Sequence, residues 1–276
     1  MSTATLDPEA FRYISNLVAT KSAIVLEPTK AYLVESRLTP VAKQHGYASL
    51  SDLVAALKTK PVNGLHHQVV EAMTTNETSF FRDQHPFDTL RTKILPELIQ
   101  ARAATKTLNI WCGAASTGQE PYTLAMVLRE HFPALRDWNV RITATDLSSQ
   151  VLAKAKQGLY NQIEINRGLP AALLVKYFQK RGLQWQISDE LRRMVDFCEL
   201  NLISTWPPLG VCDLVFLRNV LIYFSPETKR EILGKIRRLL AKDGYLFLGG
   251  AETTMNLDDH YQRIQFEKTV CYQAGR

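Results

Sequence analysis

The 276-residue chain has few cysteines and lacks the patterns in which cysteines bind zinc or form disulfide frameworks. Its four cysteines include no CxxC pair, and no histidine accompanies them at metal-ligand spacing. No apolar run approaches the roughly 18 residues of a membrane-spanning helix, and no N-terminal stretch resembles a signal peptide. We therefore expect no metal, no membrane insertion and a cytoplasmic location.

The sequence also lacks a concentrated charge of either sign. The net charge is +6, with 8 basic against 9 acidic residues in 1–90 and 25 against 18 in 91–276. A diffuse basic excess without a block of like charges is typical of solvated surface, so we expect no nucleic-acid partner. The hydrophobic fraction of 46% and the charged fraction of 22% are those of a globular protein.

The first 72 residues have the apolar spacing of helices and no convincing strand pattern. Asp7 precedes a run with apolar residues three and four apart, and a second run ends at Gly46. Ser49 or Ser51 can cap a third helix, and a fourth apolar run ends at Met73. The pattern predicts a small all-α N-terminal domain over residues 1–72.

Short apolar runs and helical stretches alternate after this region, which predicts a doubly wound, mostly parallel α/β sheet. The predicted strands are Leu108–Cys112, Val140–Ala144, Met194–Leu200, Asp213–Leu217 and Tyr245–Leu248. The predicted helices are Pro121–His131, Ser149–Lys156 and Pro226–Leu240. Two short runs, Arg263–Phe266 and Thr269–Tyr272, predict a closing antiparallel hairpin.

One connection, from Leu159 to Arg193, is longer than a crossover needs. Its segment Leu183–Ile187 alternates apolar and polar residues after Gly182, so we expect a small antiparallel β insertion at about 160–193. The α/β domain is expected to cover 91–276, after a linker at 73–90.

A turn of small residues, Gly113–Gly118, follows the first predicted strand, where open α/β sheets bind cofactors. It is not a P-loop, because Gln119-Glu120 stands where Lys-Ser/Thr belongs. The dinucleotide signature GxGxxG also fails, since Ala115 replaces its second glycine.

Two acids lie beside this turn. Glu120 begins the next helix, where it suits either the helix dipole or a ligand ammonium group. Asp146 ends the second strand, where it can bind ribose hydroxyls or cap the following helix. A ribose-binding acid and an ammonium-binding acid, without a phosphate-binding base, fit S-adenosylmethionine.

Four segments resemble the CheR family of chemotaxis receptor methyltransferases. They occur in the family's order along nearly the whole chain. The segments are Met73–Asp83, Trp111–Tyr122, Glu199–Leu202 and Arg218–Phe224. The resemblance implies an all-α domain followed by a Rossmann-like, S-adenosylmethionine-dependent methyltransferase domain.

The resemblance also implies roles for the matched residues. Arg82, with the methionine carboxylate, and Tyr223, near the methyl group, are the predicted catalytic residues. Glu120 would bind the cofactor's ammonium group and Asp146 its ribose. The other predicted cofactor-binding residues are Asn76, Thr78, Gly113, Ala114, Asn201, Leu202, Arg218 and Asn219.

The family's reaction is methyl transfer to receptor glutamates, giving methyl esters and S-adenosylhomocysteine. The resemblance implies a monomer recruited to membrane-bound receptor arrays, whose second helix docks on the receptor's helical bundle through Lys30, Arg37 and Lys43. The short, glycine-poor loop at 179–190 predicts independence from a receptor C-terminal pentapeptide. A methyltransferase of another acceptor such as RNA, and a cofactor-sensing adaptor without catalysis, stay open as alternatives.

Overall fold

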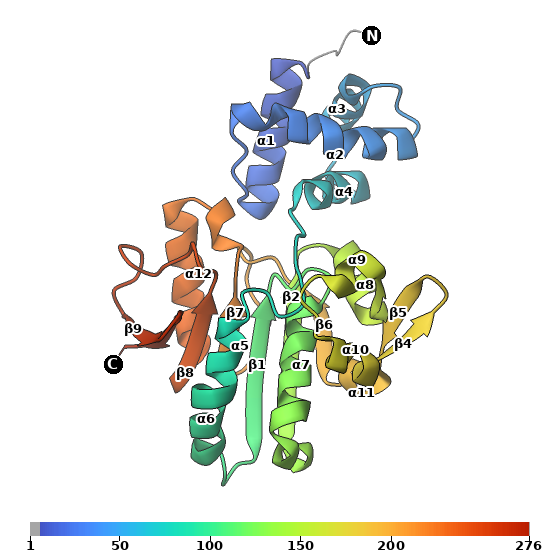
Figure 1. Ribbon diagram of the computed structural model, residues 1–276. Coiled ribbons are helices and arrows are strands. Elements are labelled where there is room, and N and C mark those ends of the chain that lie inside the picture. Colours follow the sequence, from blue (N-terminus) through green and yellow to red (C-terminus); the bar gives the residue numbers. More distant parts are fainter. Residues whose placement is uncertain (1–5, 276) are drawn as a thin grey trace. The chain divides into compact units, whose positions relative to one another are not determined.

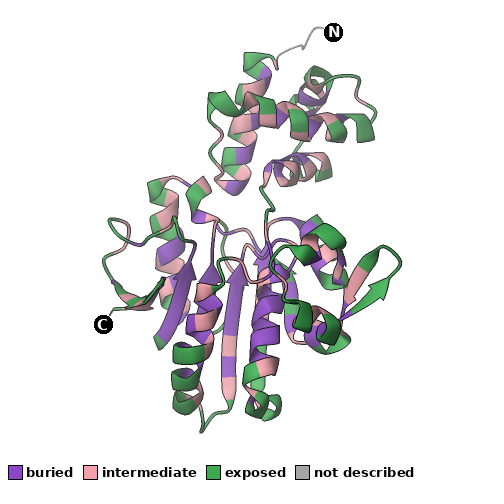
Figure 2. Cartoon of the chain, in the orientation of Figure 1, coloured by how far each residue is buried: buried purple, intermediate pink, exposed green. Residues whose placement is uncertain are grey.

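The computed structural model describes residues 6–275, which form two compact units (Figures 1 and 2). One unit extends to Thr75 and includes Tyr223–Thr228, and the other contains Asn76–Ile222 and the chain from Lys229 onward. No helix among these residues is long and apolar enough to cross a membrane.

The first unit is all-α, as predicted. Its helices are α1 (Pro8–Ser22), η1 (Pro28–Lys30), α2 (Ala31–Gln44), α3 (Leu50–Thr59) and α4 (Gly64–Met73). They enclose a core that includes Ile14, Val18, Val34, Leu38, Leu53 and Leu57.

Side-chain caps determine where these helices begin. The Asp7 carboxylate accepts the N–H of Ala10 at 3.2 Å, as expected for the start of α1. Ser49, rather than Ser51, caps α3 by accepting the N–H of Asp52 at 3.1 Å. Asn63 and His66 form a capping box at α4.

The second unit contains a seven-stranded sheet with the order β6-β2-β1-β7-β8-β10-β9. The five strands from β6 to β8 are parallel, and β10 and β9 are antiparallel. The strands are β1 (Thr107–Gly113), β2 (Asn139–Asp146), β6 (Val195–Glu199), β7 (Cys212–Leu217), β8 (Leu240–Leu248), β9 (Tyr261–Phe266) and β10 (Thr269–Ala274). The predicted Rossmann-like sheet and its closing hairpin are confirmed.

The helices of this unit connect the strands and cover the sheet. They include α5 (His85–Thr89), η2 (Leu90–Ile94), α6 (Leu95–Ala101), α7 (Gln119–His131), η3 (Pro133–Asp137), α8 (Ser149–Gln157), η4 (Leu221–Tyr223) and α12 (Pro226–Leu239). Figure 2 shows the central strands largely buried, and every residue of β7 is buried. The predicted helices correspond to α7, α8 and α12.

The helical segment from His85 to Ala101 was not predicted. Its middle turn, Leu90–Ile94, is a π-helix, and Pro96 in the next turn has no N–H to donate. Phe87, Leu90 and Ile94 are all buried and lie three and four residues apart, so the helical pattern was present in the sequence but was overlooked.

The insertion between β2 and β6 contains the expected small antiparallel sheet, with the order β3-β5-β4. Its strands are β3 (Leu159–Asn161), β4 (Phe178–Arg181) and β5 (Gln184–Ile187). Gly182, with φ of +59°, forms the tight turn between β4 and β5. Three short helices that the sequence did not predict complete the insertion: α9 (Gln162–Asn166), α10 (Ala171–Tyr177) and α11 (Asp189–Arg192).

An ion-pair cluster fixes the end of α6 to the sheet. Arg102 donates to Asp213 Oδ1 through Nε at 2.8 Å, and its Nη2 lies 2.5 Å from Asp243 Oδ1. The other Asp213 oxygen accepts the N–H of Asn109 at 2.8 Å. Since Asp213 is 5% exposed, its charge depends on Arg102 for compensation.

We expect Arg102→Met to lower the free energy of unfolding by about 3 kcal/mol, because it leaves a buried carboxylate unpaired. The control is Arg91→Met, which removes only the exposed pair with Asp88 at 3.7 Å and should cost less than about 1 kcal/mol. Urea unfolding measures both. Equal stabilities of the two variants would contradict this role.

Candidate functional site

The turn between β1 and α7 forms the centre of the candidate cofactor site. Gly118 lies just before α7 with φ of +91°, a conformation that L side chains rarely adopt. Gly113 is required for a different reason, since a Cβ there would lie 2.7 Å from Leu217 Cδ1 on β7. Ala114 and Ser116 are also left-handed, with φ of 53° and 51°. The turn thus has a strained backbone held by its surroundings.

Asp146, at the end of β2, helps to hold this strained turn. Its Oδ2 accepts the N–H of Ser116 at 2.8 Å, and its Oδ1 accepts the N–H of Ser148 at 2.9 Å. The cap of α8 is Ser148, so the alternative that Asp146 caps this helix is wrong. Backbone donors thus fix the position of this buried carboxylate at the end of β2, where the ribose contact is predicted.

Glu120 pairs with a buried arginine at the end of β7. Arg218 Nη1 lies 2.7 Å from Glu120 Oε2, and Arg218 Nη2 lies 2.8 Å from Asp83 Oδ2. The same Nη2 donates to the carbonyl of Arg82 at 3.1 Å. The Arg218 side chain is only 2% exposed, so its charge requires compensation, and these two carboxylates provide it.

Two effects on the pKa of the Glu120 carboxyl group oppose one another. Burial raises the pKa of its carboxyl group, whereas the Arg218 guanidinium favours the ionised form. Arg218 binds Oε2, and no residue between 6 and 275 provides a hydrogen-bond partner for Oε1. Glu120 can therefore accept a hydrogen bond from a ligand ammonium group while it remains paired.

The segment after α4 carries Asn76, Thr78 and Arg82. The carbonyl of Asn76 accepts a hydrogen bond from the Ser116 hydroxyl at 2.8 Å. This bond joins the segment to the turn Gly113–Gly118, called the cofactor turn below. Arg82 is half-buried, and its Nη1 donates to the carbonyl of Glu77 at 3.0 Å. The structure thus brings Asn76 and Arg82 to the turn and to Arg218, and their contacts with a cofactor stay predictions.

This segment is strained near Arg82. Phe81, Asp83 and Gln84 have φ of 48°, 64° and 36°, values uncommon for residues other than glycine. The Phe81 N–H donates to Thr123 Oγ1 of α7 at 3.1 Å, and Asp83 binds Arg218. These contacts hold a conformation that the segment would not adopt alone.

Asn219 lies directly after Arg218 in a left-handed conformation, with φ of 58°. Its N–H donates to Glu252 Oε2 at 2.8 Å, while its buried Oδ1 has no partner within residues 6–275. A buried acceptor without a donor is costly, and a bound donor would satisfy it.

The fourth predicted segment follows β6. Asn201 Oδ1 accepts the N–H of Ile203 at 3.2 Å. The carbonyl of Leu202 accepts Trp206 Nε1 and Lys235 Nζ, both at 3.1 Å. Asn201 and Leu202 therefore lie in a turn held by its own hydrogen bonds and by a lysine from α12. Their predicted contact with the cofactor is not tested by these bonds.

The remaining predicted residues belong to the first unit. Lys30 and Lys43 are exposed. Arg37 instead donates to the carbonyls of Met73 and Thr74 at 2.8 and 3.0 Å, so it also stabilises the end of α4. The carbonyl of Tyr223 accepts the N–H of Val25 at 3.1 Å. The roles of these residues stay predictions.

Three residues of this region were missed by the sequence reasoning: Asp83, Glu252 and Lys235. Asp83 is the last residue of the segment Met73–Asp83. Its role is revealed only by the ion pair with Arg218, which lies 135 positions later in the sequence. Glu252 and Lys235 had no local signal, since both bind backbone groups of distant loops. Within residues 6–275, no group of three or more His, Cys, Asp or Glu side chains could hold a metal ion.

Two family matches cover most of the chain. Residues 9–74 match the CheR methyltransferase, all-alpha domain, and residues 76–270 match the CheR methyltransferase, SAM binding domain. The chain belongs to the CheR methyltransferase family. The recognition made from the four sequence segments is therefore confirmed, and this CheR family member is a methyltransferase that uses S-adenosylmethionine.

Three relatives illustrate the similarity. The chain is 44% identical to Chemotaxis protein methyltransferase 1 of Pseudomonas aeruginosa over 99% of this chain and 100% of that protein. It is 42% identical to Chemotaxis protein methyltransferase Cher2 of Pseudomonas putida, with the same coverage. Identity to the Chemotaxis protein methyltransferase of Borreliella burgdorferi is 36%, over 86% of this chain and 85% of that protein.

The residues present fit S-adenosylmethionine. The carboxylates of Glu120 and Asp146 and the unpartnered Oδ1 of Asn219 are acceptors for an ammonium group and hydroxyls. Arg218 already has both Nη atoms occupied by protein oxygens. These acceptors, together with Arg82 as the predicted partner of a carboxylate, suit a cofactor that has a ribose and an amino acid but no phosphate.

We expect the affinity for S-adenosylhomocysteine to fall as the pH is lowered, because Glu120 must be ionised to bind an ammonium group. Its pKa is raised by burial, so this loss begins at a higher pH than for an ordinary glutamate. Glu120→Gln should weaken binding at neutral pH by about tenfold or more and flatten this pH dependence. Calorimetry across pH 5–8 measures both, and an unchanged pH profile in the variant would refute the assignment.

Proposed function

We propose that this CheR family member transfers the methyl group of S-adenosylmethionine to glutamate side chains on the cytoplasmic helical bundle of chemoreceptors. The observation that carries the proposal is the arrangement around Arg218 at the end of β7, which joins Glu120 at the start of α7 to the segment of Arg82 and Asp83. Relatives named chemotaxis protein methyltransferases, matched over their full length, support the receptor as substrate.

The proposed chemistry requires alignment rather than a strong base. The bound cofactor supplies an electrophilic methyl group. A glutamate side chain is already ionised at neutral pH, so its oxygen attacks without first losing a proton to the enzyme. Glu120, Asp146 and Arg82 would hold the cofactor's polar groups, and Tyr223 would maintain the geometry near the methyl group. Alignment of this kind lowers the barrier by converting a bimolecular reaction into a nearly unimolecular one.

The test is transfer of labelled methyl to purified receptor cytoplasmic fragments, made with and without a C-terminal pentapeptide. The proposal predicts base-labile label on glutamates of both fragments, unaffected by an RNA competitor. Pentapeptide independence rests on the two-residue turn between β4 and β5, which contains one glycine. Label on RNA would support the other acceptor, and cofactor binding without transfer would support the adaptor.

Tyr223→Phe should reduce kcat in this assay while the affinity for S-adenosylhomocysteine changes by less than about twofold. The reason is that a residue acting only on the reacting groups affects turnover more than binding. Asn219→Ala is the comparison, since it removes a predicted cofactor contact and should weaken affinity. An equal loss of kcat and affinity in Tyr223→Phe would instead indicate a binding or folding role.

Receptor docking through α2 predicts a different signature. Lys30→Glu and Lys43→Glu each change an exposed charge and should raise KM for the receptor, most strongly at low salt, with KM for the cofactor unchanged. The control is Lys60→Glu, an exposed lysine at the end of α3. Arg37 is less suitable, because its variant also loses the hydrogen bonds to the end of α4. The same receptor KM in all three variants would argue against docking through α2.

We also propose that the protein acts as a monomer in the cytoplasm and is recruited to membrane-bound receptor arrays by this docking. Recruitment is consistent with a substrate that is itself a membrane receptor. Sedimentation of the purified protein tests the monomer, and co-sedimentation with receptor-containing membranes tests recruitment.

A further inference from the structure

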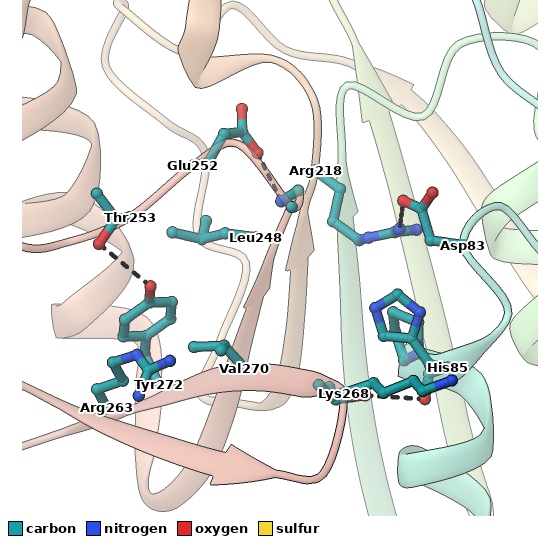
Figure 3. A pocket seen from close by; sticks show the side chains of 14 residues that line it. Asp83, His85, Arg218, Leu248, Glu252, Thr253, Arg263, Lys268, Val270 and Tyr272 are labelled. Carbon is teal, nitrogen blue, oxygen red and sulfur yellow. Dashed lines mark hydrogen bonds and ion pairs between the residues drawn. The ribbon is translucent and has the colours of Figure 1, made fainter.

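A cavity of about 270 Å³ lies at the carboxyl end of β8, beside the β9–β10 hairpin (Figure 3). Arg218 is the one predicted cofactor-binding residue that lines it. Its wall includes Arg218, Gly249, Glu252, Arg263, Lys268 and Tyr272. The volume is near the lower end for ligand pockets, which suits one side chain with part of its backbone better than a whole cofactor.

The acidic side chains of the cavity are already satisfied by the protein. Asp83 pairs with Arg218 at 2.8 Å. Glu252 accepts the N–H groups of Asn219 and Gly249 through Oε2 at 2.8 and 2.6 Å, and that of Ile222 through Oε1 at 3.3 Å. Arg218 therefore compensates the charge of Asp83, whereas Glu252 keeps its negative charge, because N–H donors fix its position without neutralising it.

The basic side chains of the hairpin are not compensated in this way. Arg263 Nη2 donates to the uncharged Gln265 Oε1 at 2.5 Å. Lys268 forms no ion pair with any residue of the described range 6–275. Figure 3 shows both side chains on the hairpin side of the cavity. With Asp83 paired to Arg218, the lining has two further cations, Arg263 and Lys268, against one carboxylate, Glu252, and this excess favours an anionic ligand.

The position of the cavity relative to the cofactor residues determines what that ligand would be. The cofactor turn follows β1, and Asp146 and Asn201 follow β2 and β6, whereas the cavity follows β8 on the other side of β7. Arg218, at the end of β7, contacts Glu120 on one side and lines the cavity on the other. Arg218 thus places the cavity next to the predicted cofactor residues, at the part of the sheet edge beyond β7 that they do not occupy.

We propose that this cavity binds the acidic receptor segment that carries the acceptor glutamate, with Arg263 and Lys268 binding carboxylates of that segment. The inference rests on the proposed function. One oxygen of the acceptor glutamate forms the bond to the methyl carbon while the carbon–sulfur bond breaks, and the sulfur keeps the electron pair. No proton is transferred, so the cavity needs charge complementarity and no catalytic base.

The test compares Arg263→Glu, Lys268→Glu and the double variant with a control, Lys242→Glu. Lys242 is an exposed lysine near the start of β8, whereas the cavity is lined by Leu248 at the other end of this strand. All three positions are exposed, so the changes should not unfold the domain. Labelled-methyl transfer gives kcat and KM for the receptor fragment at low and high salt, and calorimetry gives the affinity for S-adenosylhomocysteine.

We expect the double variant to raise KM for the receptor by about tenfold at low salt, and by less at high salt. Its affinity for S-adenosylhomocysteine should stay within about twofold of the parent protein. A receptor KM equal to that of Lys242→Glu would overturn the inference while leaving the proposed function intact. Absence of transfer by the parent protein would overturn both, and an effect on RNA methylation alone would assign the cavity to a nucleic acid.

Discussion

The buried guanidinium of Arg218 is the group on which the candidate site depends. A desolvated charge is costly, and it is retained only where its partners compensate it. Its two Nη atoms reach Glu120, Asp83 and the carbonyl of Arg82, and the rigid fork fixes the directions of these bonds. One side chain therefore binds two segments that lie 98 and 135 residues before it in the sequence.

This constraint accounts for the strain around it. The residues at 81, 83 and 84 have positive φ, as do Ala114 and Ser116 in the cofactor turn. Such conformations persist where the surroundings over-determine them. Arg218 and Asp146 supply these surroundings, since each binds one of the strained segments directly. Protein contacts thus fix the backbone of the predicted cofactor site.

The sequence was informative where a feature is local. The caps of α1 and α3, the parallel strands and the small-residue turn are each encoded within a few residues, and the structure confirms them. The segment from His85 to Ala101 was missed although its buried residues Phe87, Leu90 and Ile94 have helical spacing. The partners of Arg218, the role of Glu252 and the lysine on the Leu202 carbonyl could not be predicted, because they depend on long-range contacts. The family resemblance named Arg218 and Asn219 but not the ion pairs that position them.

The division of the sheet edge at β7 connects these observations to function. Residues after β1, β2 and β6 would bind the cofactor, residues after β8 and in the β9–β10 hairpin would bind the acceptor, and Arg218 lies between them. A single buried charge would then set the relation between the two binding regions. Alignment, rather than acid–base chemistry, would be the enzyme's main contribution to methyl transfer.

The most direct test of this account is the affinity of Asp83→Ala for S-adenosylhomocysteine, measured by calorimetry. Asp83 is not a predicted cofactor ligand, and its side chain is 43% exposed, so the variant should fold. The account predicts a loss of about tenfold, because Arg218 would no longer hold the Arg82 segment against the cofactor turn. Asp88→Ala, which removes only an exposed ion pair, should bind normally. Equal affinities of the two variants would contradict the central role of the Arg218 cluster.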